Sequence, residues 1–406
     1  MPSNPTVRPP HGLSCEIDFY SEDYILNPVS AYHKMLACGP VVWLPKNQLH
    51  AICGYTALTE ALRNHGCFQS GKGVSINEDV NAMLVGSTLN SDPPQHDVTR
   101  AITFQPLTPK ALEAVRKRIE EEADRIADQV VAKGTFDAAR ELAPHLPLTI
   151  VRDLVGLGVH GKINMLNWAG ATFELMGDPG DRRGAAFKNL KSLRHFLEDP
   201  DTLQALSPDG WANRATQLGI ERGIEPEHAV ELMRDYIAPS LDTTISAISY
   251  AMMLFATFPD QWQKMRADRS LVRNAIEEIV RLNTPIKAFS RYVAEDVDLS
   301  GVRLSKNTRV LVVFGAANRD PSRFSDPDTF DIERAVRGHV GFGHGVHACL
   351  GMHLARLEMD CLFNALADRI DSMELVGPVV PAINSSIHAL ARVPVKVVAN
   401  GATKWH

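Results

Sequence analysis

The sequence predicts a mainly α-helical protein with a small β region, folded as one domain over residues 1–406. Three observations support this fold class. Helical periodicity dominates from about residue 108 to about residue 285, strand-like segments lie nearer the two ends, and no flexible linker separates these parts. With 45% hydrophobic residues, the chain can bury a large core.

The N-terminal region begins with a polar, proline-rich segment. Residues 1–15 predict an extended leader, because their start lacks the apolar core of a signal peptide. Two apolar segments follow at 41–45 and 50–54, separated by Lys46-Asn47-Gln48. Their length and the polar residues between them predict a β-hairpin.

A long helix is predicted from Thr108 to Lys133. Thr108 can cap it, Pro109 suits its first position, and Gly134 ends it. Its apolar stripe keeps helical spacing and consists of Leu112, Val115, Ile119, Ile126 and Val130. Further helical pattern continues to about residue 285 and includes an apolar stretch at 236–258. Strand character returns at 300–315 and 394–398.

Composition excludes several classes of function. The net charge of −6 and the lack of a long basic run argue against nucleic acid as a partner. No stretch approaches the roughly 18 apolar residues that span a bilayer, so no membrane partner is expected. The six cysteines form no paired framework, which favours a reducing compartment. We expect a cytoplasmic protein.

A glycine-punctuated segment at 341–351 contains Cys349 and leads into an amphipathic helix. A helix N-terminus stabilises an anion, so we expect a lowered thiol pKa for Cys349. Such a thiolate is a plausible axial ligand for haem iron. Two alternatives are a buried hydrophobic cysteine and a zinc site, the second because histidines crowd this segment at 339, 344, 347 and 353.

The pattern F-x-x-G-x-x-x-C-x-G, formed by Phe342, Gly345, Cys349 and Gly351, resembles the haem-binding loop of the cytochrome P450 family. Three further motifs follow the order of that family. The resemblance implies a cytochrome P450 fold and b-type haem with Cys349 as the metal ligand. It also places Phe342 and Gly343 beside the cofactor.

Glu278 and Arg281 lie three residues apart and share a helical face. Taken alone, they read as an ordinary surface ion pair. They also resemble the E-x-x-R pair of the family, whose third member comes from a loop before the cysteine and corresponds to Arg334. This resemblance implies a structural role, because a bidentate guanidinium can hold a loop in register.

Residues 91–100 contain two adjacent prolines, which predict an extended approach to a helix that carries His96 and Arg100 on one face. The segment resembles the D-P-P-x-H-x-x-x-R motif of the family, whose His and Arg bind the haem propionates. Arg291 and His347 occupy matching propionate-binding positions.

Residues 238–244 place polar side chains inside the apolar helical stretch, which is costly unless they are paired or face a cavity. The segment resembles the A-G-x-D-T segment over the distal haem face. This implies that Thr243 steadies dioxygen and Asp242 relays protons. Pro239 and Ser240 depart from the family pattern. Pro239 predicts a kink, and Ser240 can donate either to oxygen or to the substrate.

The resemblance implies a monooxygenase that uses O2 and takes electrons from NAD(P)H through a ferredoxin or similar reductase system. Several segments resemble a subgroup that demethylates guaiacols or para-methoxybenzoates: 235–244, 315–321, 338–343 and 355–358. We therefore expect O-demethylation of a guaiacol-type phenol ether. The alternative is oxidation of para-substituted benzoic acids.

Candidate pocket residues are mostly apolar, as suits a small aromatic substrate: Phe68, Val74, Phe173, Ile237, Ser240, Ile286, Phe289 and Ile387. Lys72 and Ser75 fall where the benzoate-binding relatives place polar anchors. An inward Lys72 predicts a carboxylate substrate, and an outward one predicts a neutral ether. A peroxygenase and a haem-thiolate gas sensor are the rival functions. Asp242-Thr243 argues against the first, and the lack of a visible output domain argues against the second.

Overall fold

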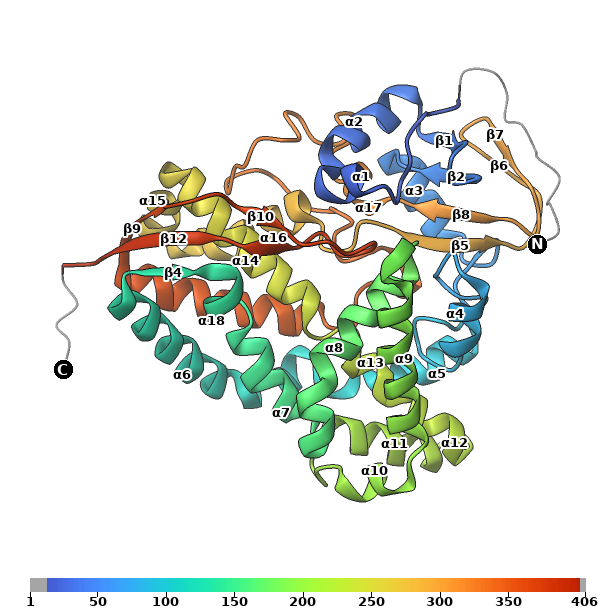
Figure 1. Cartoon of the computed structure of the whole chain (residues 1–406), viewed down its shortest axis with the longest axis horizontal. Helices are drawn as coiled ribbons and strands as arrows, with labels where there is room; N and C mark the ends of the chain where they lie inside the picture. The colour runs from blue at the N-terminus through green and yellow to red at the C-terminus, as the bar shows by residue number, and fades with distance from the viewer. Residues whose placement is uncertain (1–12, 402–406) are drawn as a thin grey trace.

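The computed structural model describes residues 13–401 and joins a large helical part to a smaller part built around a sheet (Figure 1). Residues 1–12 of the predicted leader lie outside the described residues. Its last residues are tied to the sheet part, because the Cys15 N–H donates to the Trp43 carbonyl at 2.8 Å.

The strands form one five-stranded sheet and three smaller ones. In chain order they are β1 (Val41–Leu44), β2 (Leu49–Ile52), β3 (Phe68–Gln69), β4 (Thr135–Asp137), β5 (Phe289–Val293), β6 (Val297–Leu299), β7 (Val302–Leu304), β8 (Arg309–Val312), β9 (Ile370–Leu375), β10 (Val380–Pro381), β11 (Leu390–Arg392) and β12 (Pro394–Ala399). The large sheet has the order β1-β2-β8-β5-β3, in which only β2 and β8 pair in parallel. The others are β4-β12-β9, β10-β11 and β6-β7.

The helices make up most of the remaining structure. In chain order they are α1 (Glu22–Leu26), α2 (Pro28–Cys38), α3 (Tyr55–Arg63), α4 (Glu78–Met83), α5 (Gln95–Thr103), α6 (Pro109–Lys133), α7 (Arg152–Val155), α8 (Gly158–Met176), α9 (Arg183–Glu198), α10 (Pro200–Ala205), α11 (Trp211–Glu221), α12 (Pro226–Ala229), α13 (Arg234–Ile237), α14 (Asp242–Thr257), α15 (Pro259–Ala267), α16 (Val272–Asn283), α17 (Phe314–Ala317) and α18 (Met352–Arg369).

The long helix predicted from Thr108 is α6, and both of its ends are confirmed. The Thr108 hydroxyl accepts from the Ala111 N–H at 3.2 Å, and Gly134 ends the helix with φ +73°. This conformation is one that glycine adopts at low cost. The apolar face of α6 packs beside α18, the helix that follows Cys349 (Figure 1).

The predicted strand segments are largely confirmed. The hairpin is β1–β2, and the C-terminal strand is β12. The segment 300–315 contains β7 and β8, but its strand prediction is wrong at the end, where Phe314 begins the short helix α17. There the chain turns to pack on α2, and Gly315 leaves room for Tyr32, whose ring would lie 2.3 Å from an added Cβ.

The apolar stretch at 236–258 is interrupted at Pro239, as the proline predicts. Helix α13 ends at Ile237 and α14 begins at Asp242, so the break is sharper than a kink. The extended approach predicted at Pro93-Pro94 is wrong. These two residues form a turn with a cis peptide bond, and the His96 N–H donates to the Asp92 carbonyl at 3.0 Å.

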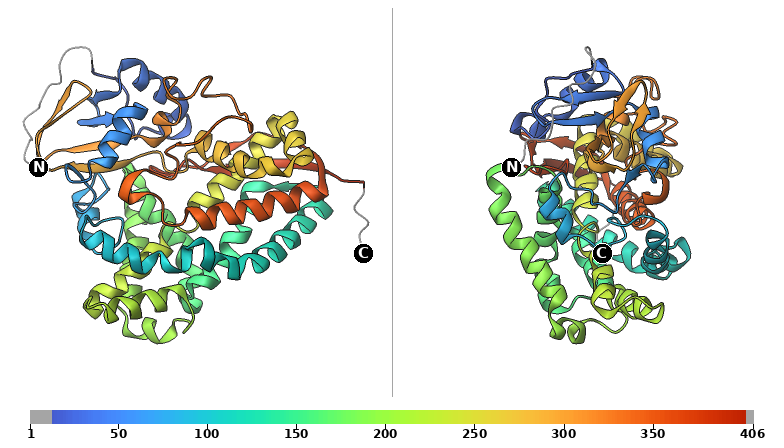
Figure 2. Two further views of the ribbon diagram at one scale, coloured as in Figure 1. Left: turned by 180° about the vertical axis from the view of Figure 1, so that it is seen from behind. Right: turned by 90° about the vertical axis from the view of Figure 1, so that its right-hand side faces the viewer.

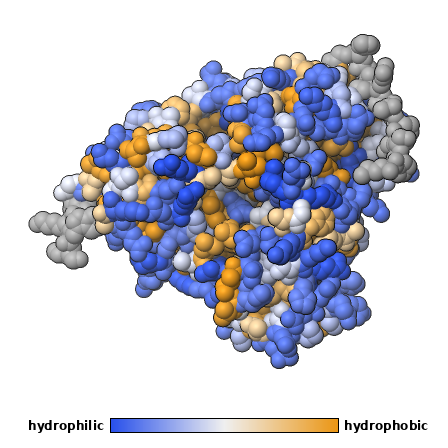
Figure 3. Space-filling view, viewed as in Figure 1, coloured by the Kyte–Doolittle hydropathy of each residue, from blue (hydrophilic) through white to orange (hydrophobic). Residues whose placement is uncertain are grey.

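The molecule is narrower when turned by 90° from the first view (Figure 2). Hydrophilic residues cover most of the face in Figure 3, with hydrophobic residues in separate groups between them. Among the described helices, none is long and apolar enough alone to cross a membrane, and one pair that passes together is bent by 103°. All six cysteines are free, and the cytoplasmic location stays a prediction.

Candidate functional site

A mainly apolar cavity lies between α8, the α13–α14 segment, β5 and the loop that carries Cys349. The structure brings residues of every predicted motif but the ion pair to its wall: Arg100, Phe173, Ser240, Thr243, Ile286, Phe289, Arg291, Phe342, Gly343, His347 and Cys349. Segments more than two hundred residues apart therefore meet at one place.

Four predicted pocket residues belong to the hydrophobic core and do not line this cavity. Phe68 belongs to β3 and packs in the cluster under the large sheet. Val74, Ile237 and Ile387 belong to the main hydrophobic core, and Ile387 forms a β-bridge with Ile286, which does line the cavity. Their apolar character alone does not distinguish a wall residue from the layer behind it.

The cysteine loop is held by its own backbone and by tight contacts. The Cys349 N–H donates to the Phe342 carbonyl at 2.7 Å, and Gly343 lies at φ +74°. Gly345 lies at φ +71°, and a Cβ there would come within 2.6 Å of the Leu62 carbonyl oxygen. Glycine is therefore required where the loop passes over α3.

The expected lowering of the Cys349 thiol pKa is wrong for the polypeptide alone. Enclosure by protein raises this pKa, and this outweighs the lowering by the backbone N–H groups of Gly351 and Met352 and by the charge of Arg100. The helix begins at Met352, three residues after the cysteine. Desolvation disfavours the thiolate more than the helix N-terminus favours it.

Hydrogen-bond donors gather at one end of the cavity. The rings of His96 and His347 lie 4.5 Å apart, and Nε2 of each is buried without a hydrogen-bond partner among the described residues. Arg291 is buried, and this burial lowers its pKa to about 10. Arg100 Nη2 donates to the Ala348 carbonyl at 2.8 Å.

This arrangement fits a haem. Buried cations and unpaired ring nitrogens are stabilised by carboxylates, and a haem carries two propionates. The same cavity wall presents the Cys349 side chain, and its other lining residues are mainly apolar, as a flat apolar macrocycle requires. The fit rests on the orphaned nitrogens of His96 and His347.

The zinc alternative is wrong. Within residues 13–401, no three His, Cys, Asp or Glu side chains lie close enough to hold a metal ion. His339 instead pairs with Glu277 at 2.8 Å, and His344 accepts from Arg63 at 2.9 Å. The histidines that crowd the sequence point to different neighbours.

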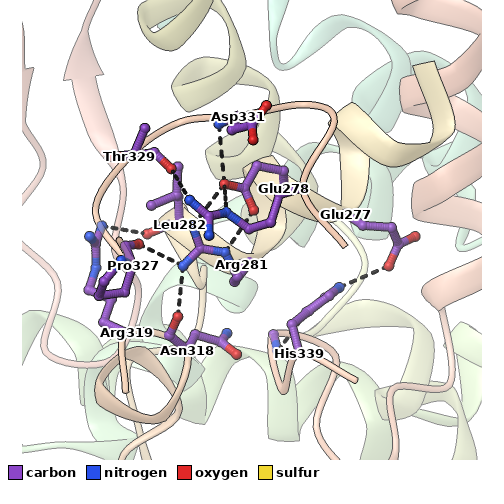
Figure 4. Close-up of polar contacts among 12 residues, drawn as sticks. Glu277, Glu278, Arg281, Leu282, Asn318, Arg319, Pro327, Thr329, Asp331 and His339 are labelled. Atoms are coloured by element: carbon purple, nitrogen blue, oxygen red, sulfur yellow. Dashed lines mark hydrogen bonds and ion pairs between the residues drawn. The ribbon is translucent and has the colours of Figure 1, made fainter. Parts of the chain in front are cut away.

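Glu278 and Arg281 form a buried ion pair, so the interpretation as a surface pair is wrong. Both side chains are 0% exposed, and their two bonds measure 2.7 and 2.8 Å. Figure 4 shows Arg281 also reaching the carbonyl oxygens of Asn318 and Pro327. Arg334 Nε donates to Glu278 at 3.1 Å. The network joins α16 to two loops before the cysteine.

The sequence analysis missed a second ion pair beside the first. Burial raises the pKa of Glu277, but hydrogen bonds from His339 and Arg356 outweigh it and lower this pKa to about 2. The Arg356 guanidinium also lies over the Phe342 ring, 4.7 Å from its centre. The sequence signal for this second ion pair was the adjacent Glu277-Glu278 doublet. Glu278 pairs with Arg281 and Arg334, whereas Glu277 pairs with His339 and Arg356.

The break before α14 arranges three hydroxyl and carboxyl groups. Thr243 Oγ1 donates to the Pro239 carbonyl at 3.2 Å, and the Ser240 hydroxyl donates to the Tyr236 carbonyl. The Asp242 carboxylate faces α8, where a Cβ at Gly170 would lie 3.5 Å from its Oδ2. Burial raises the pKa of Asp242 to about 7.

Two acidic side chains on the cavity wall, Asp235 and Glu358, were given no role in the sequence analysis, although they lie in the subgroup-like segments 235–244 and 355–358. Asp235 accepts the Thr88 N–H at 3.1 and 3.2 Å. Glu358 of α18 is 1% exposed, neither of its oxygens has a partner among the described residues, and burial raises its pKa to about 8. The signal for Glu358 was an acid on the buried stripe of a helix.

The two polar anchors of the benzoate hypothesis do not line the cavity. Lys72 is exposed, and its carbonyl accepts from Arg309 at 2.5 Å. Ser75 is buried, but its hydroxyl donates to the Leu175 carbonyl at 2.9 Å. Neither residue belongs to the lining of the cavity.

Comparison with known sequences places the chain in a family. The family model described as Cytochrome P450 matches residues 213–369. The chain is 34% identical over 385 residues to cytochrome P450 CYP199A2 of Rhodopseudomonas palustris, covering 94% of this chain and 93% of that protein. It is 30% identical over 305 residues to 6-deoxyerythronolide B hydroxylase of Saccharopolyspora erythraea, covering 73% and 74%.

Solved structures share the fold. The crystal structure of P450BioI with a ligated acyl carrier protein matches with a TM-score of 0.83 at 24% identity, covering 93% of this chain and 100% of that one. The chain therefore has the cytochrome P450 fold, belongs to the cytochrome P450 family, and is a monooxygenase that uses haem iron, O2 and electrons from a separate redox partner.

Proposed function

We propose that this monooxygenase removes the methyl group of a small, neutral methoxy-aromatic compound of the guaiacol type. The observation that carries the proposal is the cavity wall around Phe173, Ile286 and Phe289, which is mainly apolar while Lys72 faces solvent. An aromatic ring gains from such burial, and the described lining of the cavity contains no lysine to pair with a carboxylate.

The residues proposed to hold the haem come from four segments. Cys349 supplies the iron ligand, and Phe342 and Gly343 form the loop against the ring. His96, Arg100, Arg291 and His347 bind the two propionates, an assignment supported by the unpartnered nitrogens at that end of the cavity. Glu278, Arg281 and Arg334 position the loop without touching the cofactor.

When bound, the haem supplies the activation of O2 and the insertion of one oxygen atom into a C–H bond of the methoxy group. Two electrons and two protons are consumed, and the second oxygen atom leaves as water. The resulting hemiacetal breaks its bond between the carbon and the aryl-bound oxygen, which yields the phenol and formaldehyde. The protein binds the ring, excludes water and delivers protons.

Proton delivery is proposed for Asp242 and Thr243. The Thr243 hydroxyl lines the cavity, and Asp242 precedes it at the start of α14. A carboxyl group with a pKa of about 7 can hold a proton and release it near neutral pH. The Ser240 hydroxyl donates to the Tyr236 carbonyl, so we assign it no role in donating to oxygen or substrate.

Para-substituted benzoic acids are the second candidate class, because the Arg234 side chain also lines the cavity. Its guanidinium, however, pairs with Glu231 and donates to the Met83 carbonyl at 3.0 Å. Little of its charge is therefore available to a ligand. The family assignment as a monooxygenase disfavours the gas sensor. A ferredoxin is the proposed electron donor.

The test is a Soret titration of the ferric holoenzyme with guaiacol and with 4-methoxybenzoate. A shift to the high-spin spectrum with guaiacol at lower concentration supports the proposal, because a neutral ligand then displaces water from the iron. A shift with 4-methoxybenzoate alone would move the assignment to aromatic acids. No shift with any methoxy-aromatic compound would overturn the substrate proposal.

A further inference from the structure

Asp235 is an acidic side chain that lies on the cavity wall without a role in the mechanism above. It belongs to the short helix α13, which lies near α8 just before the break at Pro239 (Figure 1). Ser240 and Phe173 line the same cavity. The resemblance of the segment 235–244 gives Asp235 no stated role, so its role is argued from its contacts.

The contacts of Asp235 leave its charge without a direct counterion. Both carboxylate oxygens accept from the Thr88 N–H, at 3.1 and 3.2 Å, and the Thr88 hydroxyl also bonds to this carboxylate. Within residues 13–401 it forms no ion pair: the adjacent Arg234 pairs with Glu231 instead. Arg100 donates to the Ala348 carbonyl, on the cysteine side of the cavity.

Acceptor capacity therefore remains on the cavity side. A carboxylate offers about four lone-pair positions, and the N–H and hydroxyl of the one residue Thr88 leave some of them open. Burial raises the pKa of Asp235 to about 6, so the group is still mainly ionised at neutral pH. An ionised oxygen in a half-buried site gains from any donor that a ligand brings.

The charge of Asp235 also disfavours anionic ligands. The nearby guanidinium groups of Arg234 and Arg100 offset this charge only in part, because they donate to Glu231 and to the Ala348 carbonyl. A second carboxylate in this cavity would therefore be repelled, since like charges at close range repel strongly where water is scarce. A ligand hydroxyl has the opposite effect, because it supplies the missing donor. The site thus distinguishes ligands by the polar group on the ring.

We propose that Asp235 accepts a hydrogen bond from the substrate and makes the enzyme prefer methoxy-aromatics that carry a phenolic hydroxyl over those that carry a carboxylate. This rests on the proposed O-demethylation and adds the polar group that the substrate must carry. Asp235 is the specificity-determining residue, and its bond to Thr88, which lines the same cavity, holds the carboxylate in place.

The experiment compares the parent holoenzyme with the variant Asp235→Asn in Soret titrations. The ligands are three methoxyphenols (guaiacol and its 3- and 4-isomers), anisole, and 4-methoxybenzoate. Anisole has no hydrogen-bond donor, so a change in its affinity reports a change in the shape or packing of the cavity. Asparagine keeps an acceptor for the Thr88 N–H and removes the charge. Asp209→Asn, an exposed acid paired with Arg214, controls for the lost charge.

Asp235→Asn should weaken binding of the tightest methoxyphenol by about tenfold or more. Anisole should change little, 4-methoxybenzoate should bind more tightly, and Asp209→Asn should match the parent. If the variant lost haem, Asp235→Glu would replace it, and retained preference for phenols would support the proposal.

Equal loss of affinity for anisole and the methoxyphenols would overturn the proposal, since Asp235 would then only order the Thr88 loop. Failure of the proposed function is distinguishable, because the parent itself would then give no shift with any methoxy-aromatic ligand, or a shift with 4-methoxybenzoate alone.

Discussion

Asp242 and Glu358 are carboxyl groups that hold protons close to neutral pH. Burial raises their pKa values to about 7 and about 8. Asp242 belongs to α14, which precedes the cysteine loop in the chain, and Glu358 belongs to α18, which follows it. Because desolvation is the sole cause in both cases, each can be tested by a substitution that keeps the shape and removes the proton.

Asp242→Asn should lower the rate of substrate oxidation by about 100-fold, because a positioned acid is lost. Asp242 is protonated below its pKa of about 7. The parent rate should therefore fall as pH rises above about 7, and the variant should lose this inflection. Steady-state rates between pH 6 and 9 provide the test, with the exposed Asp201→Asn as control. A variant that keeps both rate and inflection would contradict the relay.

Glu358→Gln should stabilise the holoenzyme increasingly as pH rises. In the folded protein Glu358 stays protonated up to about pH 8, whereas its ordinary pKa is 4.5. Between these values the unfolded chain binds fewer protons, so the parent loses stability with rising pH and the glutamine variant does not. Urea unfolding at pH 5 and pH 8 measures the difference. A pH-independent offset between the two proteins would contradict the buried neutral acid.

The motif residues around the cavity could be predicted because glycines, prolines and paired charges leave local patterns. The roles of Asp235 and Glu358 could not be predicted, because their burial and their hydrogen-bond partners depend on neighbours from distant segments. Val74 and Ile237 show the converse. Their apolar side chains suit a pocket, but the structure packs them in the main hydrophobic core and they do not line the cavity.

The cysteine loop depends on glycine at one position above all. Gly345 has φ +71° and lies against the Leu62 carbonyl, so Gly345→Ala should cost about 2 kcal/mol or more. Gly184→Ala in α9 is the matched control, because nothing lies within 4 Å of its added Cβ, and it should be neutral or slightly stabilising. Urea unfolding followed by the Soret band separates the two. Equal effects would contradict the close approach.

The buried network of α16 should be equally sensitive. Glu278→Gln leaves Arg281 buried without a counterion, which should cost about 3–5 kcal/mol. Glu120→Gln on the exposed face of α6 should change stability by less than about 0.5 kcal/mol. The measurement is the free energy of unfolding together with haem retention. A small loss for Glu278→Gln would show that the pair is not needed to hold the loop.

Local signals predicted α6, the β1–β2 hairpin and the break at Pro239, since caps, turns and proline act within a few residues. The order of the large sheet could not be predicted, because β8 joins β2 from more than two hundred residues away. The strand prediction through Gly315 failed for the same reason. Packing against Tyr32 sets its conformation.

The whole molecule brings together a cysteine loop, a set of cationic donors and an apolar chamber that no single segment contains. The family match establishes a monooxygenase with a separate electron donor. The single-domain prediction for residues 1–406 stays a prediction. The chemistry of the substrate is the central claim that follows from the cavity, from the outward Lys72 and from Asp235.

The most direct test is turnover of guaiacol by the holoenzyme with NADH and a surrogate ferredoxin system, with formaldehyde and NADH both quantified. The account predicts formaldehyde in proportion to the NADH consumed, and faster formation from guaiacol than from 4-methoxybenzoate. NADH consumption without formaldehyde from guaiacol, or efficient turnover of 4-methoxybenzoate alone, would contradict it.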